Sequence, residues 1–363
     1  MKPSNTNLVW RTHAPLAPFT TLQVGGPAAA LVDVDGSESL RSALRQANER
    51  DLEPMILGGG SNVVVADEGV TAAVLRLHGG TIDAEPQSAN RWRVRIGAGV
   101  AWTTLVEWAV RADLAGIECL AGIPGTVGAA PIQNIGAYGQ EVADTLQSVG
   151  VIDLNTLEQH RLAASDCGFG YRQSHFKSTW RGQYVVTDIE LELIEGGAPT
   201  LKYDQLQQAV AGSSSPTLQH VATTVAAIRR TKSMVVDPTD PNYRSAGSFF
   251  TNPIVSTSVA DKVSRIAAMQ VPQWRVDDHH VKLSAAWLID AAGMKKGYGL
   301  GHVGLSSKHT LALINRGGAT TTELITFAAH IRQRVRDHWG VTLHPEPVLL
   351  GFQQSWTELL DSL

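Results

Sequence analysis

The sequence predicts a mixed α+β protein with two or three domains. Three observations support this fold class. The chain of 363 residues is longer than most single domains and can bury a sizeable core. Short segments with alternating apolar residues, typical of strands, are interspersed with longer segments of helical periodicity. The composition, with 43% hydrophobic and 18% charged residues, is that of an ordinary globular protein.

Short apolar or alternating segments predict the strands, and apolar residues three and four positions apart predict the helices. The expected strands cover residues 29–34, 54–57, 63–65, 91–97, 149–153, 184–193 and 310–315. The expected helices cover residues 37–49, 102–114, 218–232, 257–269, 285–292 and 323–339. Ser37 is the expected N-cap of the first helix. The turn-rich segment 237–242, Asp-Pro-Thr-Asp-Pro-Asn, predicts the main domain boundary.

Charge and cysteine content argue against several classes of protein. The formal net charge of −4 gives no electrostatic reason to expect nucleic acid or an anionic membrane as a partner. The N-terminus lacks the basic-then-apolar pattern of a signal peptide, and no apolar run is long enough to cross a membrane. Cys119 and Cys167 are too few for a disulfide framework. We therefore expect reduced thiols and a cytoplasmic protein.

Two glycine-rich segments are candidate ligand-binding loops. Residues 121–140 carry five glycines, two prolines and no charged side chain, so the backbone is open to a flat polar ligand. The alternative is a buried, turn-rich connection, which is commoner for such runs in general. Residues 58–62, Gly-Gly-Gly-Ser-Asn, lie between two expected strands, where successive N–H groups can form an anion-binding nest. The alternative there is a plain hairpin turn.

Two other motifs point to no site. Residues 299–304 match the pattern GxGxxG, but a loop precedes them and a strand follows, the reverse of a dinucleotide-binding context. Residues 276–281, Val-Asp-Asp-His-His-Val, resemble a metal patch without a matching second ligand cluster, so a solvated loop is expected and no metal. No GxSxG, HExxH or P-loop motif supports a hydrolase or a kinase.

Three polar residues remain as candidates for chemistry. Arg172 lies between aromatic residues, Ser248 opens a Phe-Phe step, and Glu346 lies between two prolines, which exclude a mid-helix position. Taken singly, each has an ordinary structural explanation: a surface ion pair, a turn hydroxyl and a solvated carboxylate. Local pattern alone does not show that they meet.

Taken together, five segments in this order resemble the UDP-N-acetylenolpyruvoylglucosamine reductase (MurB) family, over about residues 15–352. The segments are LGGGSNVVV (57–65), GIPGTVGAAPIQNIGAYG (122–139), GYRQSHFK (170–177), GSFFTNP (247–253) and HPE (344–346). The resemblance implies an FAD-binding domain of the vanillyl-alcohol-oxidase (PCMH) type over residues 15–232, with subdomains at about 15–80 and 81–232. A smaller α+β substrate-binding domain would cover residues 233–345, and a C-terminal segment, 346–363, would return to the active site.

The implied reaction belongs to peptidoglycan synthesis. A hydride from NADPH passes to FAD and then to the enolpyruvyl double bond of a UDP-sugar, giving UDP-N-acetylmuramate. No His or Cys stands obviously placed for covalent flavin attachment, so non-covalent FAD is expected. We further expect a monomer in the cytoplasm, with no nucleic-acid or membrane partner.

By resemblance, Arg172 and Glu346 would polarise the substrate carboxylate, and Ser248 would donate a proton to the enolate-like intermediate. An arginine fork matches carboxylate geometry, whereas Glu346 can help only if protonated or bridged, so we predict a raised pKa for it. The implied cofactor-binding residues are Gly58, Gly59, Gly60, Ser61, Asn62, Gly122, Ile123, Pro124, Gly125, Gly128, Ile135, Gly136 and Arg229. The implied substrate-binding residues are Tyr138, Tyr203, Lys232 and Asn252, where Tyr203 marks the branch of the family with a substrate-loop tyrosine.

One position departs from the family pattern, and two other functions remain open. Other members often carry hydroxyl residues at the Ala129-Ala130 position, so side-chain contacts to the flavin would be lost there while backbone contacts survive. An oxidase or dehydrogenase on the same flavin domain would not require Ser248 and Glu346 together. A non-catalytic nucleotide-sugar binder would keep the fold without the chemistry.

Overall fold

The structure, a computed structural model, describes residues 8–212 and 215–363. The described chain forms two compact units. The first unit contains the described residues of 1–14, 28–60 and 71–230, and the second contains 15–27, 61–70 and 231–363. The second unit therefore takes two short segments from the N-terminal part of the sequence. Each unit has its own hydrophobic core.

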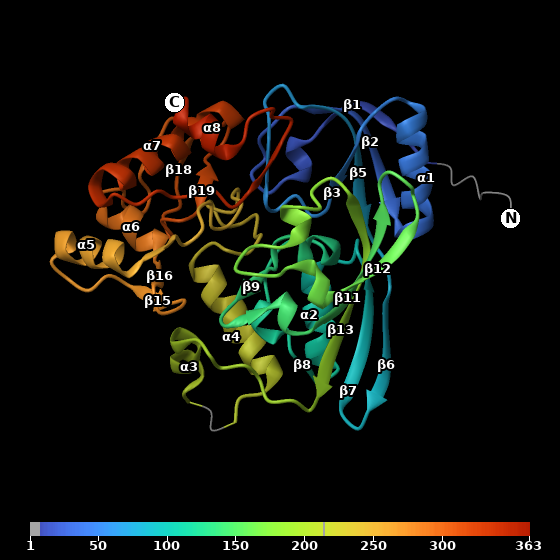
Figure 1. The fold of residues 1–363 in the computed structure, drawn as a ribbon, viewed down its shortest axis with the longest axis horizontal. Coiled ribbons are helices and arrows are strands. Elements are labelled where there is room, and N and C mark those ends of the chain that lie inside the picture. Colours follow the sequence, from blue (N-terminus) through green and yellow to red (C-terminus); the bar gives the residue numbers. More distant parts are fainter. Residues whose placement is uncertain (1–7, 213–214) are drawn as a thin grey trace, which may run out of the picture. The chain divides into compact units, whose positions relative to one another are not determined.

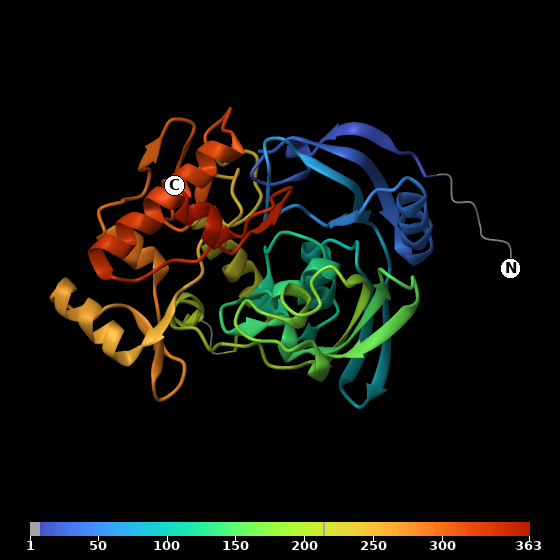
Figure 2. The same ribbon diagram turned by 45° about the horizontal axis from the view of Figure 1, so that its top comes forward.

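A four-stranded sheet opens the first unit. Its strand order is β1 (Arg11–Pro15), β2 (Pro27–Asp35), β5 (Val70–His78) and β3 (Pro54–Leu57). Helix α1 (Gly36–Glu49) lies against this sheet (Figures 1 and 2) and buries Leu40 and Leu44. The predicted cap was wrong: the N-cap is Asp35, because Gly36, with a φ of 77°, turns the chain directly from β2 into the helix.

The first unit also contains a larger antiparallel sheet, whose long strands run side by side in Figure 1. Its strand order is β12 (Gln159–Ala163), β11 (Leu146–Asp153), β13 (Tyr184–Glu195), β7 (Arg91–Gly97) and β6 (Ile82–Ser88), with β8 (Leu114–Ala115) paired to β13. Strand β7 has the predicted alternation: Val94 and Ile96 are buried, while Arg93 and Arg95 form ion pairs on the other face, both reaching Glu190.

Helix α2 (Trp102–Arg111) follows β7 and ends three residues earlier than predicted. Asp113 has a φ of 55°, and Leu114 then pairs with Glu195 at the end of β13. The left-handed Asp113 ends the helix, and the distant pairing holds the following residues as a strand. The remaining elements of the unit are β9 (Gly136–Ala137), β10 (Gln140–Glu141), α3 (Asp204–Val210) and α4 (Leu218–Thr231).

The second unit combines small sheets with helices. Its sheets are the parallel pair β4 (Val63–Val65) and β20 (Val348–Leu350), the set β14 (Ile254–Ser256), β16 (His280–Leu283) and β15 (Gln273–Arg275), and the set β17 (Gly299–Leu300), β18 (Val303–Leu305) and β19 (Leu313–Asn315). Its helices are α5 (Thr257–Ala267), α6 (Ala285–Ala291), α7 (Thr321–Trp339) and α8 (Trp356–Asp361). Helix α7 buries Leu324, Phe327, Ile331 and Val335, which lie on one face as the periodicity predicts.

The structure decides between the alternative interpretations of two sequence motifs, residues 299–304 and 58–62. The GxGxxG segment forms the antiparallel β17–β18 pair, with Gly301 at a φ of 57°, and therefore opens no helix. Strands β3 and β4, on either side of residues 58–62, belong to different sheets. The plain-hairpin interpretation of that loop is therefore wrong. Across residues 8–212 and 215–363, we find no helix with the length and hydropathy of a membrane span.

Candidate functional site

The glycines at residues 58–60 lie directly against the second glycine-rich segment. A Cβ atom on Gly58 would come within 2.5 Å of Thr126 Oγ1, and one on Gly59 within 2.7 Å of Gly125 Cα. A Cβ on Gly128 would meet Ala98 Cβ at 2.6 Å. Glycine is required at residue 59 because two backbones approach each other closely there, whereas the nearest neighbours of Gly58 and Gly128 are side-chain atoms.

Two backbone donors of this loop have no backbone acceptor within the described residues. Gly60 is buried and has a φ of 61°. In the described chain, the N–H groups of Gly59 and Gly60 donate to no other backbone group. A left-handed turn with free N–H groups is the geometry of an anion-binding nest. The chain then enters the second unit at Ser61 and Asn62, where the Asn62 carbonyl accepts a hydrogen bond from Val348 N–H at 2.9 Å.

Hydrogen bonds fix the middle of the segment 121–140, and positions on both sides of it are partly exposed. Val127 N–H and Gly128 N–H donate to the carbonyls of Val100 and Ala98. Gly122 and Gly125 have φ values of 73° and 119°, which favour glycine. The predicted cofactor-binding positions 122–125, 135 and 136 are all partly exposed. These partly exposed positions suit a flat ring system, and the N–H groups of residues 59–60, which have no backbone acceptor among the described residues, suit a pyrophosphate. FAD contains both groups.

Arg172 is held by the backbone of the glycine-rich segment. Its Nη2 donates to the Gly136 carbonyl at 2.6 Å, and its Nη1 to the Asn134 carbonyl at 3.4 Å. Arg172 has a φ of 54° and lies in a turn closed by mutual hydrogen bonds between Gly170 and Gln173. The arginine is partly buried, so its guanidinium is both orientated and accessible.

Tyr138, Tyr203 and Arg229 lie together in the first unit. The rings of Tyr138 and Tyr203 meet edge to face with centroids 5.5 Å apart. Burial lowers the pKa of Arg229 to about 10, with a further lowering by Arg172 and an opposing effect of Tyr138, so Arg229 stays protonated near neutral pH. Burial also raises the pKa of both tyrosines, which keeps them as neutral hydroxyl donors.

Ser248 and Glu346 lie in neighbouring segments of the second unit. Glu346 N–H donates to the Phe249 carbonyl at 2.8 Å, and Thr251 N–H donates to the His344 carbonyl at 3.0 Å. Phe249, next to Ser248, is fully buried and fixes the segment. Arg172 lies in the first unit, so convergence of all three residues on one substrate stays a prediction.

The two predicted substrate residues of the second unit have different surroundings. Asn252 Oδ1 accepts a hydrogen bond from Ala285 N–H at the start of α6, which orientates the amide. Lys232 precedes the buried Ser233, whose hydroxyl donates to Asp240 at 2.7 Å. His309 lies near Lys232: burial first, and then Lys232 and Lys296, lower its pKa to about 4.

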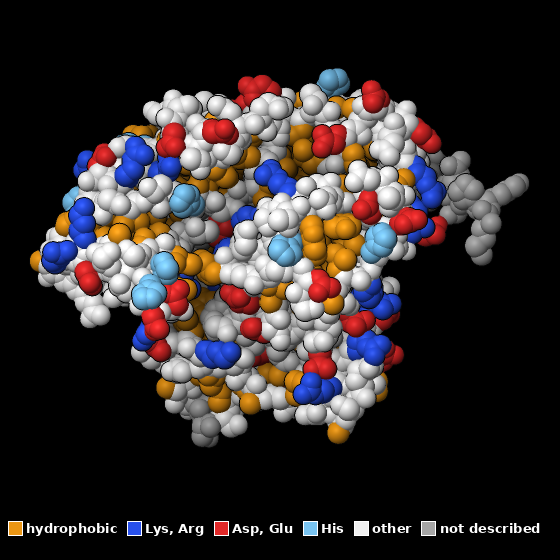
Figure 3. Space-filling view, in the orientation of Figure 1, with side chains coloured by type: hydrophobic (Ala, Val, Ile, Leu, Met, Phe, Trp, Pro, Cys, Tyr) orange, Lys and Arg blue, Asp and Glu red, His pale blue; other side chains and the backbone are white. Residues whose placement is uncertain are grey.

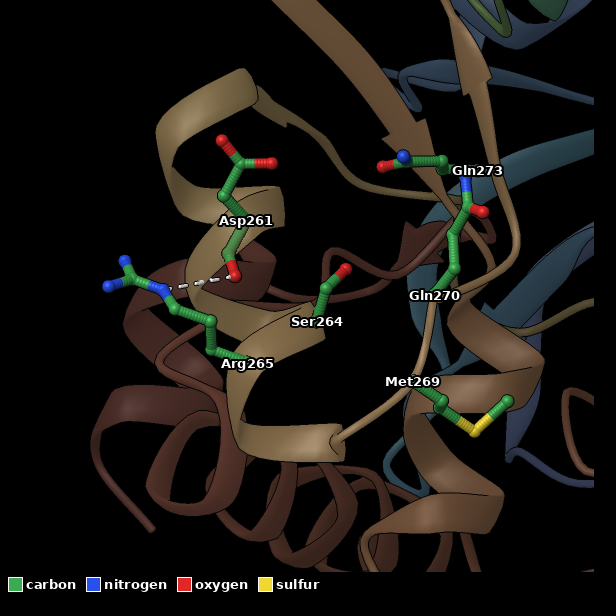
Figure 4. Close-up of a pocket in the computed structure, with 6 residues that line it drawn as sticks. All are labelled: Asp261, Ser264, Arg265, Met269, Gln270 and Gln273. Carbon is green, nitrogen blue, oxygen red and sulfur yellow. Dashed lines mark hydrogen bonds between the residues drawn. The ribbon is translucent and has the colours of Figure 1, made fainter.

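The other surface features lie apart from these residues. Within the described ranges, no three His, Cys, Asp or Glu side chains are placed to hold a metal, and residues 277–280 form a turn stabilised by Asp277. Acidic and basic side chains are interspersed over the face in Figure 3. A hollow beside α5 contains no predicted site residue (Figure 4). It is lined by Asp261, Ser264, Arg265, Met269, Gln270 and Gln273.

Comparison with known proteins gives the class first and then the family. Residues 28–161 match a model described as an FAD binding domain, which defines a flavoprotein. Residues 238–350 match the UDP-N-acetylenolpyruvoylglucosamine reductase C-terminal domain. Proteins of that name from Thermobifida fusca and Streptomyces avermitilis are 43% and 42% identical, covering 93% and 94% of this chain and 97% and 94% of their own. The chain belongs to the UDP-N-acetylenolpyruvoylglucosamine reductase (MurB) family.

A solved structure supports the same assignment. The UDP-N-acetylenolpyruvylglucosamine reductase (MurB) from Thermus caldophilus is 28% identical, with a TM-score of 0.64, and covers 95% of this chain and 99% of its own. Membership of the family confirms the predicted fold class and the predicted activity: an FAD-dependent oxidoreductase of peptidoglycan synthesis that acts on a UDP-sugar, with NADPH as hydride donor.

Sequence reasoning missed two polar residues that organise these regions. Asn134 is buried and its side chain bonds to three residues in two segments around Arg172, although in the sequence it is only a polar residue in a glycine-rich run. His309 follows a Ser-Ser-Lys run and showed no local sign of burial. The sequence signal for Asn134 was its residue type in a glycine-rich run, just before Ile135-Gly136. Asn is one of the few residues that readily adopt positive φ.

Proposed function

We propose that Arg172, Ser248 and Glu346 are the catalytic residues of this reductase. The proposal is supported by family membership over 93% of the chain and by the way each residue is held within its own unit. The observation that carries it is the fixed guanidinium of Arg172, which donates to two backbone carbonyls of the glycine-rich segment. A cation fixed in this way can stabilise developing negative charge without reorganising.

The cofactor-binding residues are proposed from the fit described above. Gly58, Gly59 and Gly60, continued by Ser61 and Asn62, would hold the pyrophosphate of FAD, and Gly122–Gly125, Gly128, Ile135 and Gly136 would line the ring. Arg229 would add a buried positive charge beside it. When bound, FAD supplies the chemistry of hydride transfer from NADPH to C3 of the enolpyruvyl group.

Arg172 and Glu346 would bind the substrate carboxylate, whose neighbouring double bond is reduced. The arginine fork pairs with both carboxylate oxygens and draws charge toward itself. Glu346 acts in its protonated form, because an ionised carboxylate would repel the substrate. Ser248 donates the proton to C2. Because a serine hydroxyl is a weak acid, the group it protonates must be strongly basic and short-lived.

The remaining substrate contacts and the domain roles are also proposed. Tyr138 and Tyr203 offer neutral hydroxyl donors, and Lys232 and Asn252 offer donors from the second unit, for the UDP-sugar. Residues 15–232 serve as the FAD-binding domain, residues 233–345 as the substrate-binding domain and residues 346–363 as the returning segment. The enzyme works as a cytoplasmic monomer without nucleic-acid or membrane partners.

An anaerobic assay of the two half-reactions tests the proposal. Purified protein reconstituted with FAD is reduced with NADPH, and the enolpyruvyl UDP-sugar is then added while the flavin absorbance is followed. We expect rapid bleaching and then rapid recovery of the colour. In Arg172→Ala, bleaching proceeds near the wild-type rate and recovery slows by about 10²-fold or more.

Two outcomes would replace the proposal with a rival. Recovery of the colour by oxygen alone, at a speed comparable to that with the UDP-sugar, would indicate an oxidase on the same domain. Colourless protein that takes up no FAD would indicate a nucleotide-sugar binder. Equal slowing of both half-reactions in Arg172→Ala would remove this residue from the proposed role but would leave the assignment of the protein as a reductase unchanged.

A further inference from the structure

Asn134 is a buried side chain at the centre of the segments that surround Arg172. Its exposed fraction is 1%, and its amide uses both ends. Nδ2 donates to Glu141 Oε2 at 2.7 Å and to the Gly170 carbonyl at 3.1 Å, while Oδ1 accepts from Ala143 N–H at 3.1 Å. The three bonds join the glycine-rich segment, the turn after it and the Arg172 turn.

The backbone of Asn134 has a conformation that few residues tolerate. Its φ of 49° lies in the left-handed region, where Asn costs less than most side chains. The carbonyl of Asn134 accepts a hydrogen bond from Arg172 Nη1, and the carbonyl of Gly136, two residues later, accepts one from Arg172 Nη2. Rotation of the chain at Asn134 would therefore move both acceptors of the guanidinium.

The same side chain also fixes the other end of the arginine. Gly170, whose carbonyl accepts from Asn134 Nδ2, begins the turn that carries Arg172. Ser174, fully buried just after that turn, donates its hydroxyl to the Ile132 carbonyl at 2.6 Å. The turn is thus attached to residues 132–136 on both sides, and the Asn134 amide is the attachment that also orientates the acceptors.

We propose that Asn134, supported by Glu141, is the positioning residue for Arg172 in the second half-reaction. The inference rests on the proposed role of Arg172 and adds a residue that touches no substrate itself. Loss of the amide leaves Arg172 present but free to leave the two carbonyls. A misplacement of about 1 Å at such a site can cost about 10²-fold in rate.

A double-mutant cycle tests this role. Asn134→Gly keeps the left-handed backbone accessible and removes the side chain together with its three hydrogen bonds. We expect flavin reduction by NADPH to stay within about twofold and colour recovery by the enolpyruvyl substrate to slow by about 10- to 100-fold. In an Arg172→Lys background, where the fork is already lost, the same change should slow recovery by less than about twofold.

A second variant keeps the size of the side chain and gives a readout in pH. Asn134→Asp places a carboxylate against Glu141, where two ionised groups repel, and lowering the pH lets one proton bridge the pair. The rate of recovery relative to wild type should therefore rise as the pH falls from about 8.5 to about 6. Flavin content and melting temperature show whether either variant has folded.

The outcomes separate this inference from the proposed function. If Arg172→Lys recovers colour at the wild-type rate, the role of Arg172 is wrong. Suppose instead that Arg172→Lys slows colour recovery, and that Asn134→Gly slows it by the same factor in the Arg172→Lys background as in wild type. Asn134 then does not act through Arg172 and the inference is overturned. A pH-independent defect in Asn134→Asp, or slowing of both half-reactions in Asn134→Gly, would also overturn it.

Discussion

Arg172 and Ser248 are held in different ways. The arginine depends on side-chain bonds of Asn134 and Ser174 and on the close approach of Gly136. Ser248 depends on backbone pairing between the segments around Phe249 and Glu346, with the buried ring of Phe249 beneath it. A position built from side chains can be lost by one substitution, whereas a position built from backbone pairing tolerates changes in its neighbours.

Removal of the serine hydroxyl tests the proposed chemistry of the second region and has the largest expected effect. In Ser248→Ala, reduction of the flavin by NADPH should stay near wild type. Recovery by the enolpyruvyl substrate should slow by about 10²- to 10⁴-fold, the usual contribution of a general acid. Stopped-flow absorbance measures both steps, and equal slowing of the two would contradict the assigned role.

Removal of the Glu346 carboxyl tests the same region with a smaller loss. In Glu346→Ala, recovery should slow by about 10²- to 10³-fold, as when one stabilising donor is removed. Glu346→Gln keeps a neutral donor and should lose about tenfold or less if the protonated form is the active one. The backbone bond to Phe249 survives in both variants. Turnover of Glu346→Ala at the wild-type rate would remove this residue from the site.

A methyl group on Gly136 tests whether the first region is the more sensitive one. Its Cβ would lie 2.7 Å from Glu141 Cγ, 2.8 Å from the Gln140 carbonyl and 3.2 Å from Arg172 Nη1. We expect Gly136→Ala to slow recovery by about 10- to 100-fold through displacement of the arginine. Gly170→Ala is the matched control, because its Cβ would meet only Gln173 Cβ at 3.9 Å and should change the rate by less than about twofold.

The two regions also differ in what the sequence could predict. The glycine loops and most strands follow local rules, and β7 alternates as its residues indicate. The predicted end of α2 was wrong: Leu114 lies outside the helix and pairs with a strand about eighty residues away. Asn134 escaped notice because one of its partners, Gly170, is 36 residues distant. Local pattern identifies residues that can occupy turns or be buried. It does not show which distant carbonyl accepts a hydrogen bond from a buried amide.

A partly buried histidine gives the last and smallest test of the comparison, because its effect appears only in acid. The pKa of His309 is lowered from 6.5 to about 4, chiefly by burial and then by Lys232 and Lys296. The unfolded chain therefore binds a proton more readily, and stability contributed by neutral His309 is lost as the pH falls from about 6.5 toward 4. Between pH 7 and about 4.5 the loss is roughly 2 kcal/mol.

His309→Gln removes the titrating group but keeps a polar side chain in its place. Urea unfolding followed by tryptophan fluorescence should show a smaller drop in midpoint between pH 7 and about 4.5 than the wild type shows. His220→Gln, at an exposed position on α4, is the control and should leave that drop unchanged. If His309→Gln loses as much stability in acid as wild type, protonation of His309 does not account for the loss.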